Sequence, residues 1–363
     1  MNNENQTIHK SDDNLTIYGW DEKLNQLKQE SIYSTLAHGR VSIVHRTCYE
    51  VISGNGLFQC ELTGNMMYGK SDDELPCTGD WVIFQPFDEH KGIIVDRLPR
   101  ERTLYRKKSG TVADKQAIAS YVDKAFIVQS LDDNFNVRRV ERFMVQIMEE
   151  NISSVLVLNK ADLDFDRQSV EEQIKHISSQ IPVFFTSIHQ LETIVRLRKS
   201  ISEGETVVFV GSSGVGKSSL VNALCEKPVL LTSDISLSTG KGRHTSTRRE
   251  MVLMDSSGVL IDTPGVREFG LAIDNPDSLA EVLEISDYAE LCRFKDCKHI
   301  NEPGCAVIEA VNSGALDSKV YESYLKLRRE AWHFSASEHE KRKKEKSFTK
   351  FVEEVKNRKD ANR

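Results

Sequence analysis

The chain has 363 residues, of which 39% are hydrophobic and 28% charged, an ordinary composition for a globular protein of two or three domains. No apolar run approaches the roughly 20 residues that a membrane-spanning helix requires, and the polar N-terminus does not resemble a secretory signal. Seven cysteines in such a chain fit a reducing cytoplasm better than a disulfide framework. We therefore expect a cytoplasmic protein with no membrane association.

The net charge of −7 hides a basic C-terminal tail. Residues 341–363 hold ten Lys and Arg against four Asp and Glu. Such a tail could lie along a phosphate backbone, because nucleic-acid binding depends on local charge neutralisation. A solvated helical tail of mixed charge explains the same composition equally well.

Changes of pattern divide the chain into four parts. Residues 1–34 form a polar leader with a short helical pattern, and residues 35–100 contain short strand-like runs. A basic connector at 97–112 spans the boundary that follows. Residues 101–274 continue with alternating strands and helices, and residues 275–363 are helical around a cysteine cluster. The predicted fold class is a multidomain α/β protein.

The strand-like runs of residues 35–100 are separated by glycine or asparagine turns. The predicted strands are residues 39–44, 48–52, 57–62, 80–84 and 92–95. Five short strands this close together predict a small barrel of the OB type. Such barrels often bind oligonucleotides, with the loop at 65–79 as a candidate contact, but they also serve as structural modules.

Apolar strands alternate with helices from residue 124 onward, which indicates a parallel sheet covered on both faces. Ligands on such a sheet bind at the carboxyl ends of the strands. The predicted strands are residues 125–128, 153–158, 182–185, 206–210, 250–254 and 258–261, and the predicted helices are residues 137–150 and 170–179.

A Gly-x4-Gly-Lys-Ser sequence follows the strand at 206–210 and precedes an apolar run at helical spacing, which predicts a phosphate-binding P-loop. The glycines let backbone N–H groups face a phosphate chain, Lys217 would reach the outer phosphates, and Ser218 would hold Mg²⁺. A glycine-rich turn that binds nothing is the alternative. The predicted contacts are Gly211, Ser212, Ser213, Gly214, Val215, Gly216, Lys217, Ser218 and Ser219.

The sequence Asn159-Lys160-Ala161-Asp162, at another strand end, predicts which base is bound. The Asp162 carboxylate can accept two hydrogen bonds from the Watson–Crick edge of guanine, which adenine cannot match. The Asn159 amide would support the pocket, and the Lys160 stem would lie over the base. Because Asn-Lys turns are common, the motif indicates guanine only together with the P-loop.

Two further stretches complete the predicted nucleotide site. Asp262 and Gly265, in Asp-Thr-Pro-Gly, would supply an acidic group near Mg²⁺ and an N–H that senses the γ-phosphate. Residues 240–247 are polar and glycine-rich, as in a mobile switch, where Thr245, or failing it Thr247, would complete Mg²⁺ coordination.

Hydrolysis requires a group that orients the attacking water. Ras-type GTPases place a glutamine just after the Asp-x-x-Gly turn, but Val266 occupies that position here and cannot polarise water. We therefore expect slow intrinsic hydrolysis, with His244 as the candidate group within the chain. A merely solvated loop histidine is the alternative.

A cysteine and histidine cluster with the spacing Cys-x4-Cys-x-His-x5-Cys is formed by Cys292, Cys297, His299 and Cys305. Three thiols and one imidazole suit a structural zinc ion with no position open to water, although four unrelated core residues are possible. Small buried hydrophobes are expected at the scattered cysteines Cys48, Cys60, Cys77 and Cys225.

The order of the motifs resembles that of a circularly permuted GTPase, because Asn159 to Asp162 and the turn at Thr186 and Ser187 precede the P-loop. With a barrel in front, Gly-Arg-His-Thr-Ser-Thr in the switch and the cysteine cluster behind, residues 35–335 closely resemble the ribosome small subunit-dependent GTPase A (RsgA) family.

The resemblance implies an OB barrel, a permuted GTPase domain and a C-terminal zinc-binding helical domain. It also implies that Thr186 and Ser187 form the base-stacking turn, and that the small ribosomal subunit, late in its maturation, binds the protein and stimulates GTP hydrolysis. The sequence departs from the family pattern at this turn, at Ser246, where threonine is usual, and in its long leader.

We therefore expect an enzyme that hydrolyses GTP to GDP and phosphate, with Lys217, His244 and Thr245 as catalytic residues. Mg²⁺ would bind with GTP at Ser218 and Thr245, and one Zn²⁺ would be structural. The expected partners are the small ribosomal subunit and its rRNA, and the protein is expected to be a monomer. The alternatives are a nucleotide-gated RNA-binding module with little turnover and a GTPase with a non-ribosomal protein partner.

Overall fold

A computed structural model describes residues 14–67, 71, 73–107, 115–226, 250–254, 258–262, 279–280 and 282–335. The chain forms two compact units: Met1–Arg106 with Lys115–Gly270, and Lys107–Asp114 with Leu271–Arg363. None of the helices in these described stretches combines the length and the apolar character needed to cross a bilayer.

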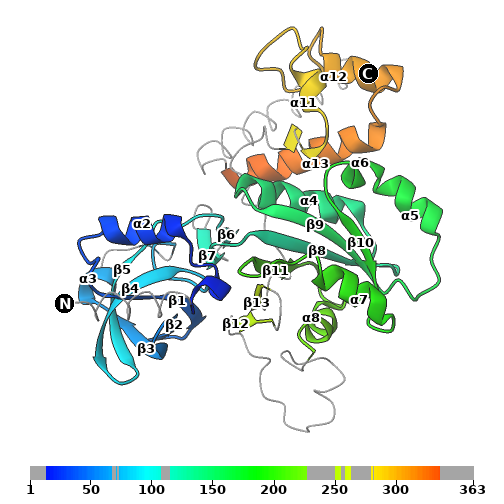
Figure 1. Ribbon diagram of the computed structural model, residues 1–363. Helices are drawn as coiled ribbons and strands as arrows, with labels where there is room; N and C mark the ends of the chain where they lie inside the picture. The colour runs from blue at the N-terminus through cyan, green and yellow to red at the C-terminus, as the bar shows by residue number, and fades with distance from the viewer. Residues whose placement is uncertain are drawn as a thin grey trace, which may run out of the picture. The chain divides into compact units, whose positions relative to one another are not determined.

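The first unit starts with a closed five-stranded barrel, which confirms the predicted OB-type architecture (Figure 1). Closure follows from two pairings: β3 runs parallel to β5, and β4 pairs antiparallel with β1. Helix α3 (Gly64–Met67) follows β3. The strands are β1 (Ala37–Val44), β2 (Tyr49–Ser53), β3 (Gly56–Leu62), β4 (Trp81–Asp88) and β5 (Lys91–Arg97).

Before the barrel come the short helix η1 (Thr16–Tyr18) and helix α2 (Glu22–Glu30). The Asp21 carboxylate caps α2 by accepting a hydrogen bond from the Leu24 N–H at 2.8 Å. Trp20 and Leu24 are buried in one cluster with Trp81 of β4, so this helix covers the outside of the barrel.

The sheet formed by residues 124–262 continues into the barrel, with the strand order β10-β9-β8-β11-β13-β12-β1. Its strands are β8 (Lys124–Ser130), β9 (Ser153–Asn159), β10 (Val183–Thr186), β11 (Thr206–Val210), β12 (Glu250–Leu253) and β13 (Val259–Asp262). All lie within one or two residues of their predicted positions. The expectation of a wholly parallel sheet is wrong at β12, which is antiparallel to β13 because the connection between them is far shorter than a parallel crossover requires.

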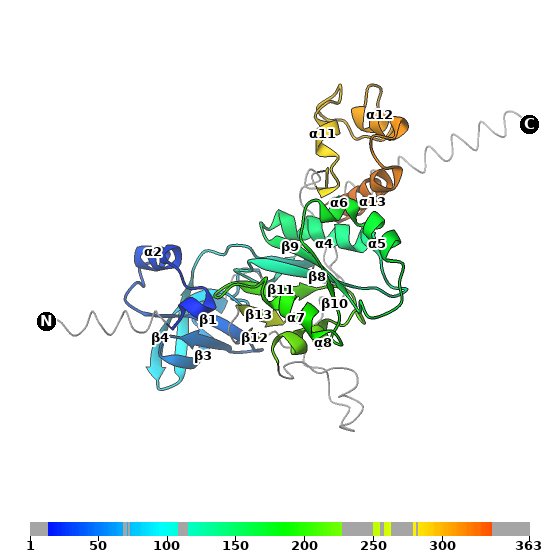
Figure 2. The same ribbon diagram turned by 45° about the vertical axis from the view of Figure 1, so that its right-hand side comes forward.

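Helices cover both faces of this sheet, with α4 opposite to α7 and α8 (Figure 1, Figure 2). The predicted helix at 170–179 is divided at Ile174 into α5 and α6. The helices are α4 (Val137–Glu149), α5 (Arg167–Gln173), α6 (Lys175–Ser178), α7 (Leu191–Arg198) and α8 (Lys217–Leu224).

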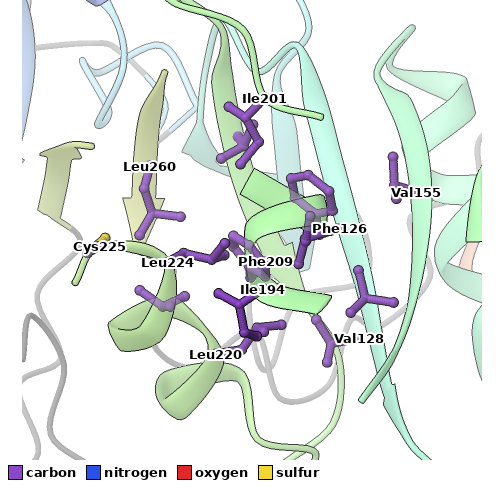
Figure 3. Packing of buried hydrophobic residues seen from close by; sticks show 14 of the residues in the cluster. Phe126, Val128, Val155, Ile194, Ile201, Phe209, Leu220, Leu224, Cys225 and Leu260 are labelled. Carbon is purple, nitrogen blue, oxygen red and sulfur yellow. The ribbon is translucent and has the colours of Figure 1, made fainter. Parts of the chain in front are cut away.

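The core under α7 and α8 is built from alternate residues of neighbouring strands (Figure 3). Phe126 of β8 pairs in register with Phe209 of β11, and their rings stack with centroids 4.9 Å apart. Ile194 of α7 and Leu220 of α8 pack into the same cluster. This packing fixes the strand that leads to the P-loop against the helix that leaves it.

Two sequence expectations fail locally. The connector at 97–112 contains β6 (Leu104–Lys107), which pairs with β7 (Lys115–Ala119), because its basic side chains hide the strand pattern. Of the scattered cysteines, Cys60, Cys77 and Cys225 are buried, but Cys48 is only half-buried where β2 begins.

A single buried arginine joins the barrel to the P-loop strand. The Arg40 guanidinium donates to the carbonyl of Gly79 at 3.0 Å and to the Thr206 hydroxyl at 2.8 Å. Burial lowers the pKa of Arg40 to about 10. Three residues further along β1, Ile43 pairs with Glu250 of β12, so the two sheets are continuous.

The second unit contains α11 (Ser286–Ala289), α12 (Ala306–Ser313) and α13 (Ser318–Ser335). Helix α12 contacts α11, and Tyr288 of α11 donates a hydrogen bond to the carbonyl of Ala315, just beyond α12, at 3.2 Å. The residues between α11 and α12 carry the predicted metal ligands.

A buried ion pair holds the start of β4. The Arg100 guanidinium lies 2.6 Å from the Asp80 carboxylate, and their side chains are 7% and 0% exposed. Asp80 also accepts the Cys77 N–H at 2.7 Å, while Arg100 donates to the carbonyls of Asp73 and Leu75. The pair therefore fixes the end of the loop between β3 and β4.

We predict that Asp80→Asn lowers the free energy of unfolding by about 3 kcal/mol, because the buried Arg100 charge loses its counter-ion. Urea unfolding followed by tryptophan fluorescence measures this, because two of the three tryptophans, Trp20 and Trp81, are buried in one cluster at the barrel. The control is Asp88→Asn, whose partner Lys91 lies 3.8 Å away with both side chains 58% exposed. That change should cost less than about 0.5 kcal/mol, and equal effects of the two substitutions would contradict the assignment.

Candidate nucleotide and metal sites

Four strand ends gather at one edge of the sheet, and each carries a predicted nucleotide contact. Strand β9 ends at Asn159, β10 at Thr186, β11 at Val210 and β13 at Asp262. Thr186 pairs in register with Asn159, so these two ends are level. Polar groups far apart in the sequence therefore meet at the carboxyl edge of a parallel sheet, where such folds bind ligands.

The P-loop connects β11 to α8, and two of its glycines are required by close approaches. Gly211 has φ of 149°, and a Cβ there would lie 2.4 Å from the Val128 carbonyl oxygen. Gly216 has φ of 89°, and its Cβ would lie 2.4 Å from Nδ2 of Asn159. Any side chain at either position would push the loop away from the neighbouring strands.

The Lys217 ammonium folds back over the loop. Its Nζ donates to the carbonyls of Gly211 at 2.8 Å and Ser212 at 2.6 Å. Ser213 and Gly214 are exposed at the tip, and Ser218 and Ser219 are half-buried in the first turn of α8. The nine predicted P-loop residues thus form a loop and the first turn of the helix that follows it.

Residues 159–162, here called the base loop, are attached to the P-loop through Asn159, whose side chain is 3% exposed. Its Nδ2 donates to the Val215 carbonyl at 2.9 Å, and its Oδ1 accepts from the Thr186 hydroxyl at 3.2 Å. The Ala161 N–H donates to the Thr186 carbonyl at 3.0 Å. These hydrogen bonds therefore join predicted nucleotide contacts of the base loop, the end of β10 and the P-loop.

Asp162 presents an exposed carboxylate whose Oδ1 accepts a hydrogen bond from Ser187. This hydrogen bond lowers the pKa of Asp162 below its ordinary value. Ser187 is itself buried and fixed, because its N–H donates to the hydroxyl of Thr193 at 3.0 Å. Thr193, in the first turn of α7, escaped sequence reasoning because it lies outside every motif.

Several predicted residues lie outside the described part of the chain. These are His244, Thr245, Thr247 and Gly265. Asp262 is described only as the last residue of β13. Its backbone position places it on the strand next to the P-loop strand, as the motif requires.

The metal-ligand cluster in the second unit brings together all four predicted residues. The ligand atoms of Cys292, Cys297, His299 and Cys305 lie within 4.8 Å of one another. Cys292 Sγ lies 3.9 Å from Cys305 Sγ, and His299 Nδ1 lies 3.5 Å and 3.4 Å from these two sulfurs. A tetrahedral ion with metal–sulfur bonds of about 2.3 Å and metal–nitrogen bonds of about 2.0 Å requires separations of about 3.8 Å and about 3.5 Å. Cys292, His299 and Cys305 match these separations and Cys297 Sγ lies within 4.8 Å of their ligand atoms, so the four residues can hold one metal ion.

The loop between α11 and α12, which carries the metal ligands, is held by Glu302 and Tyr321, two residues that are not among the predicted ligands. The Glu302 carboxylate accepts the N–H groups of Ile300 at 2.9 Å and Asn301 at 3.1 Å. The Tyr321 hydroxyl of α13 donates to the His299 carbonyl at 2.6 Å. His299 has φ of 53°, an unusual conformation for a non-glycine residue, and these hydrogen bonds help to keep it there.

A P-loop strand in one parallel sheet with an Asn-Lys-x-Asp strand that precedes it in the chain, with β8 between the two, defines a circularly permuted P-loop GTPase. A model of the RsgA GTPase family matches residues 97–272. The small ribosomal subunit biogenesis GTPase RsgA 1 of Bacteroides thetaiotaomicron is 76% identical over 359 residues, 99% of each chain. The corresponding protein of Leptospira interrogans is 35% identical, covering 93% of this chain and 96% of its own. The chain therefore belongs to the RsgA family of GTPases, as predicted.

Solved structures agree with this assignment. YjeQ from Thermotoga maritima superposes with a TM-score of 0.63 at 26% identity, covering 81% of this chain and 98% of its own. The circularly permuted GTPase YloQ has a TM-score of 0.61 at 22% identity, covering 83% and 97%, and so supports the permuted fold. An ABC transporter model also matches residues 194–359, a stretch with the P-loop but without Asn159 to Asp162.

We predict that Asp162→Asn shifts the base preference from guanine to xanthine. An amide places a donor where guanine also has a donor, whereas the C2 oxygen of xanthine would accept it. The affinity for GDP should fall about 100-fold, equivalent to about 3 kcal/mol, and XDP should bind more tightly than GDP. Calorimetric titration with both nucleotides measures this. Asp164→Asn, an exposed neighbour, should leave both affinities unchanged. An Asp162→Asn protein that still prefers GDP would contradict the assignment of Asp162 as the carboxylate that binds guanine.

Proposed function

We propose that this protein hydrolyses GTP as a factor in late maturation of the small ribosomal subunit, and that the subunit stimulates hydrolysis. The observation that carries the proposal is the Asn159 side chain, which joins the base loop to the P-loop in a chain 76% identical to a small ribosomal subunit biogenesis GTPase. A protein with this role would work in the cytoplasm, and we propose that it does so as a monomer.

The nucleotide site supports GTP hydrolysis with defined roles for its residues. Asp162 would bind guanine, and the P-loop N–H groups would bind the phosphates. Lys217 would exchange its two loop carbonyls for phosphate oxygens and stabilise the negative charge that develops there. Ser218 and Thr245 would hold Mg²⁺, which would neutralise phosphate charge. His244 remains the proposed group that orients water.

A groove on the barrel supports rRNA binding. It has a volume of about 1050 Å³ and lies at the turn between β1 and β2 and the turn between β4 and β5. Arg46, Lys91 and His90 line it and supply basic and flat side chains that suit a nucleic-acid backbone and bases. The lining also includes His45, whose ring nitrogen lies 2.7 Å from the Glu50 carboxylate. This groove is a third candidate contact, in addition to the loop at 65–79 and the basic tail at 341–363.

We also propose that the metal of the second unit is a single structural Zn²⁺. Three thiolates and one imidazole are the ligands that zinc prefers, and the set of four leaves no position for water. The ion would fix the loop between α11 and α12 and so shape the surface of this unit.

The first prediction of this proposal concerns stimulation. GTP hydrolysis by the protein alone should be slow, and purified small subunits should raise it at least about 10-fold, whereas large subunits should not. Lys217→Ala should abolish the stimulated rate, because phosphate charge loses its main stabilising cation. Phosphate release and co-sedimentation are measured together at low and moderate salt.

The outcomes separate the candidate functions. Subunit binding without stimulation would favour a nucleotide-gated RNA-binding module. Absence of subunit binding even at low salt, with GTP hydrolysis intact, would favour a non-ribosomal protein partner.

The second prediction concerns the metal. Elemental analysis should find one zinc per chain, and Cys305→Ser should remove nearly all of it, because a hydroxyl does not replace a thiolate ligand. The unit should also become protease-sensitive, since metal binding and folding are coupled in small sites. Cys48→Ser, a half-buried cysteine of the barrel, is the matched control and should keep the zinc. Full zinc content in Cys305→Ser would contradict the ligand set.

A further inference from the structure

Asp132 lies between the phosphate loop and the base loop, although it belongs to neither motif. It follows β8, and β8 pairs with the P-loop strand β11 on one side and with β9 on the other. The turn that contains Asp132 is hydrogen-bonded to the base loop, because the Leu131 N–H donates to the Asn159 carbonyl at 2.9 Å. Asp132 therefore stands at the same edge of the sheet as the predicted nucleotide contacts.

The two carboxylate oxygens of Asp132 have different partners. Oδ1 accepts the Ser130 hydroxyl at 2.7 Å and the Asn134 N–H at 3.0 Å, which closes the turn after β8. Oδ2 accepts the Lys160 ammonium at 2.8 Å. One oxygen thus holds the turn, and the other holds a residue of the Asn-Lys-x-Asp sequence.

Lys160 is unusual in its backbone as well as in its partner. Its φ of 62° lies in the left-handed region that few lysines adopt. With the ammonium fixed at Asp132, the four-carbon stem runs from the end of β9 toward the end of β8. The side chains of Lys160 and Asp132 remain 35% and 24% exposed, so an arriving base can reach the stem.

We propose that Asp132 is a positioning residue for guanine nucleotides: it fixes Lys160 so that the apolar stem already lies in place when the base binds. This inference rests on the proposed GTPase function. A flexible lysine would lose conformational freedom on binding, and prior fixation removes part of that cost. Because GTP and GDP share the base, the contribution should be equal for both.

The ion pair is stable over the pH range in which the protein works. Burial alone would raise the pKa of Asp132, but the hydrogen bonds from Lys160 and Ser130 outweigh it and lower the pKa to about 2. Because the pKa of this carboxylate is lowered, the ion pair is complete at any pH above the usual pKa of aspartate and is lost only in strong acid. The effect of Asp132 on nucleotide affinity should therefore not change between pH 6 and pH 8.

The two-oxygen arrangement provides a sharp test. In Asp132→Asn the amide oxygen can still accept from Ser130 and Asn134, while the amide NH₂ replaces the oxygen that bound Lys160. We expect the Kd values for GDP and for a non-hydrolysable GTP analogue to rise by the same factor, about 3- to 10-fold, with an unchanged Tm. Calorimetric titration in Mg²⁺ buffer measures this, and the exposed neighbour Asp133→Asn should bind as the wild type does.

A double-mutant cycle tests whether Asp132 affects nucleotide affinity through Lys160. Lys160→Met keeps an apolar stem without the ammonium, so adding Asp132→Asn to it should change Kd less than about 2-fold. Wild-type affinity in Asp132→Asn, or a full additional loss in the Lys160→Met background, would overturn the inference while leaving the GTPase function intact. Failure of the wild-type protein to bind either nucleotide would instead overturn the proposed function and this inference with it.

Discussion

The nucleotide site depends on one buried amide, the side chain of Asn159. Its two polar atoms are satisfied by two different segments, the P-loop carbonyl of Val215 and the hydroxyl of Thr186. This requires β9, β10 and β11 to end close together, and it requires Gly216 to have no side chain, since a Cβ there would meet the amide. Loss of the amide would leave buried polar groups unpaired, and it would also remove the hydrogen bond that joins the base loop to the P-loop.

The arrangement explains why a permuted chain keeps the same site. Strands β8, β9 and β10 precede the P-loop strand in the sequence, yet they lie on one side of it in the same parallel sheet, with β8 adjacent to β11, β9 next and β10 outermost. The site is determined by which strand ends are adjacent in the sheet, and the order in which the chain visits them is secondary. The barrel is attached to this same sheet through the Ile43 to Glu250 pairing and through Arg40, whose guanidinium binds the first residue of the P-loop strand.

Most of the fold and the motif residues could be predicted because their signals are local. Apolar runs gave each strand of the large sheet to within two residues, and the P-loop, the base loop and the metal ligands are each short stretches of characteristic residues. The partners that hold them could not be predicted, because they are distant in the chain. Asp132 is 28 residues from Lys160, and Asp80 is 20 residues from Arg100. A single aspartate outside any motif gives no sequence signal that indicates which distant residue it will contact.

The continuity of the sheet has a consequence for solubility in the cell. Eleven strands form one sheet, and its barrel end closes on itself through the pairing of β4 with β1, so that among the described strands β10 lies at the open outer end. Exposed edges invite pairing with other chains, and short or charged edges discourage it. Strand β10 has only four residues, and the Arg167 guanidinium lies over its Phe185 ring at 4.4 Å. The outer end of this apolar sheet thereby offers little backbone on which a neighbouring chain could begin to aggregate.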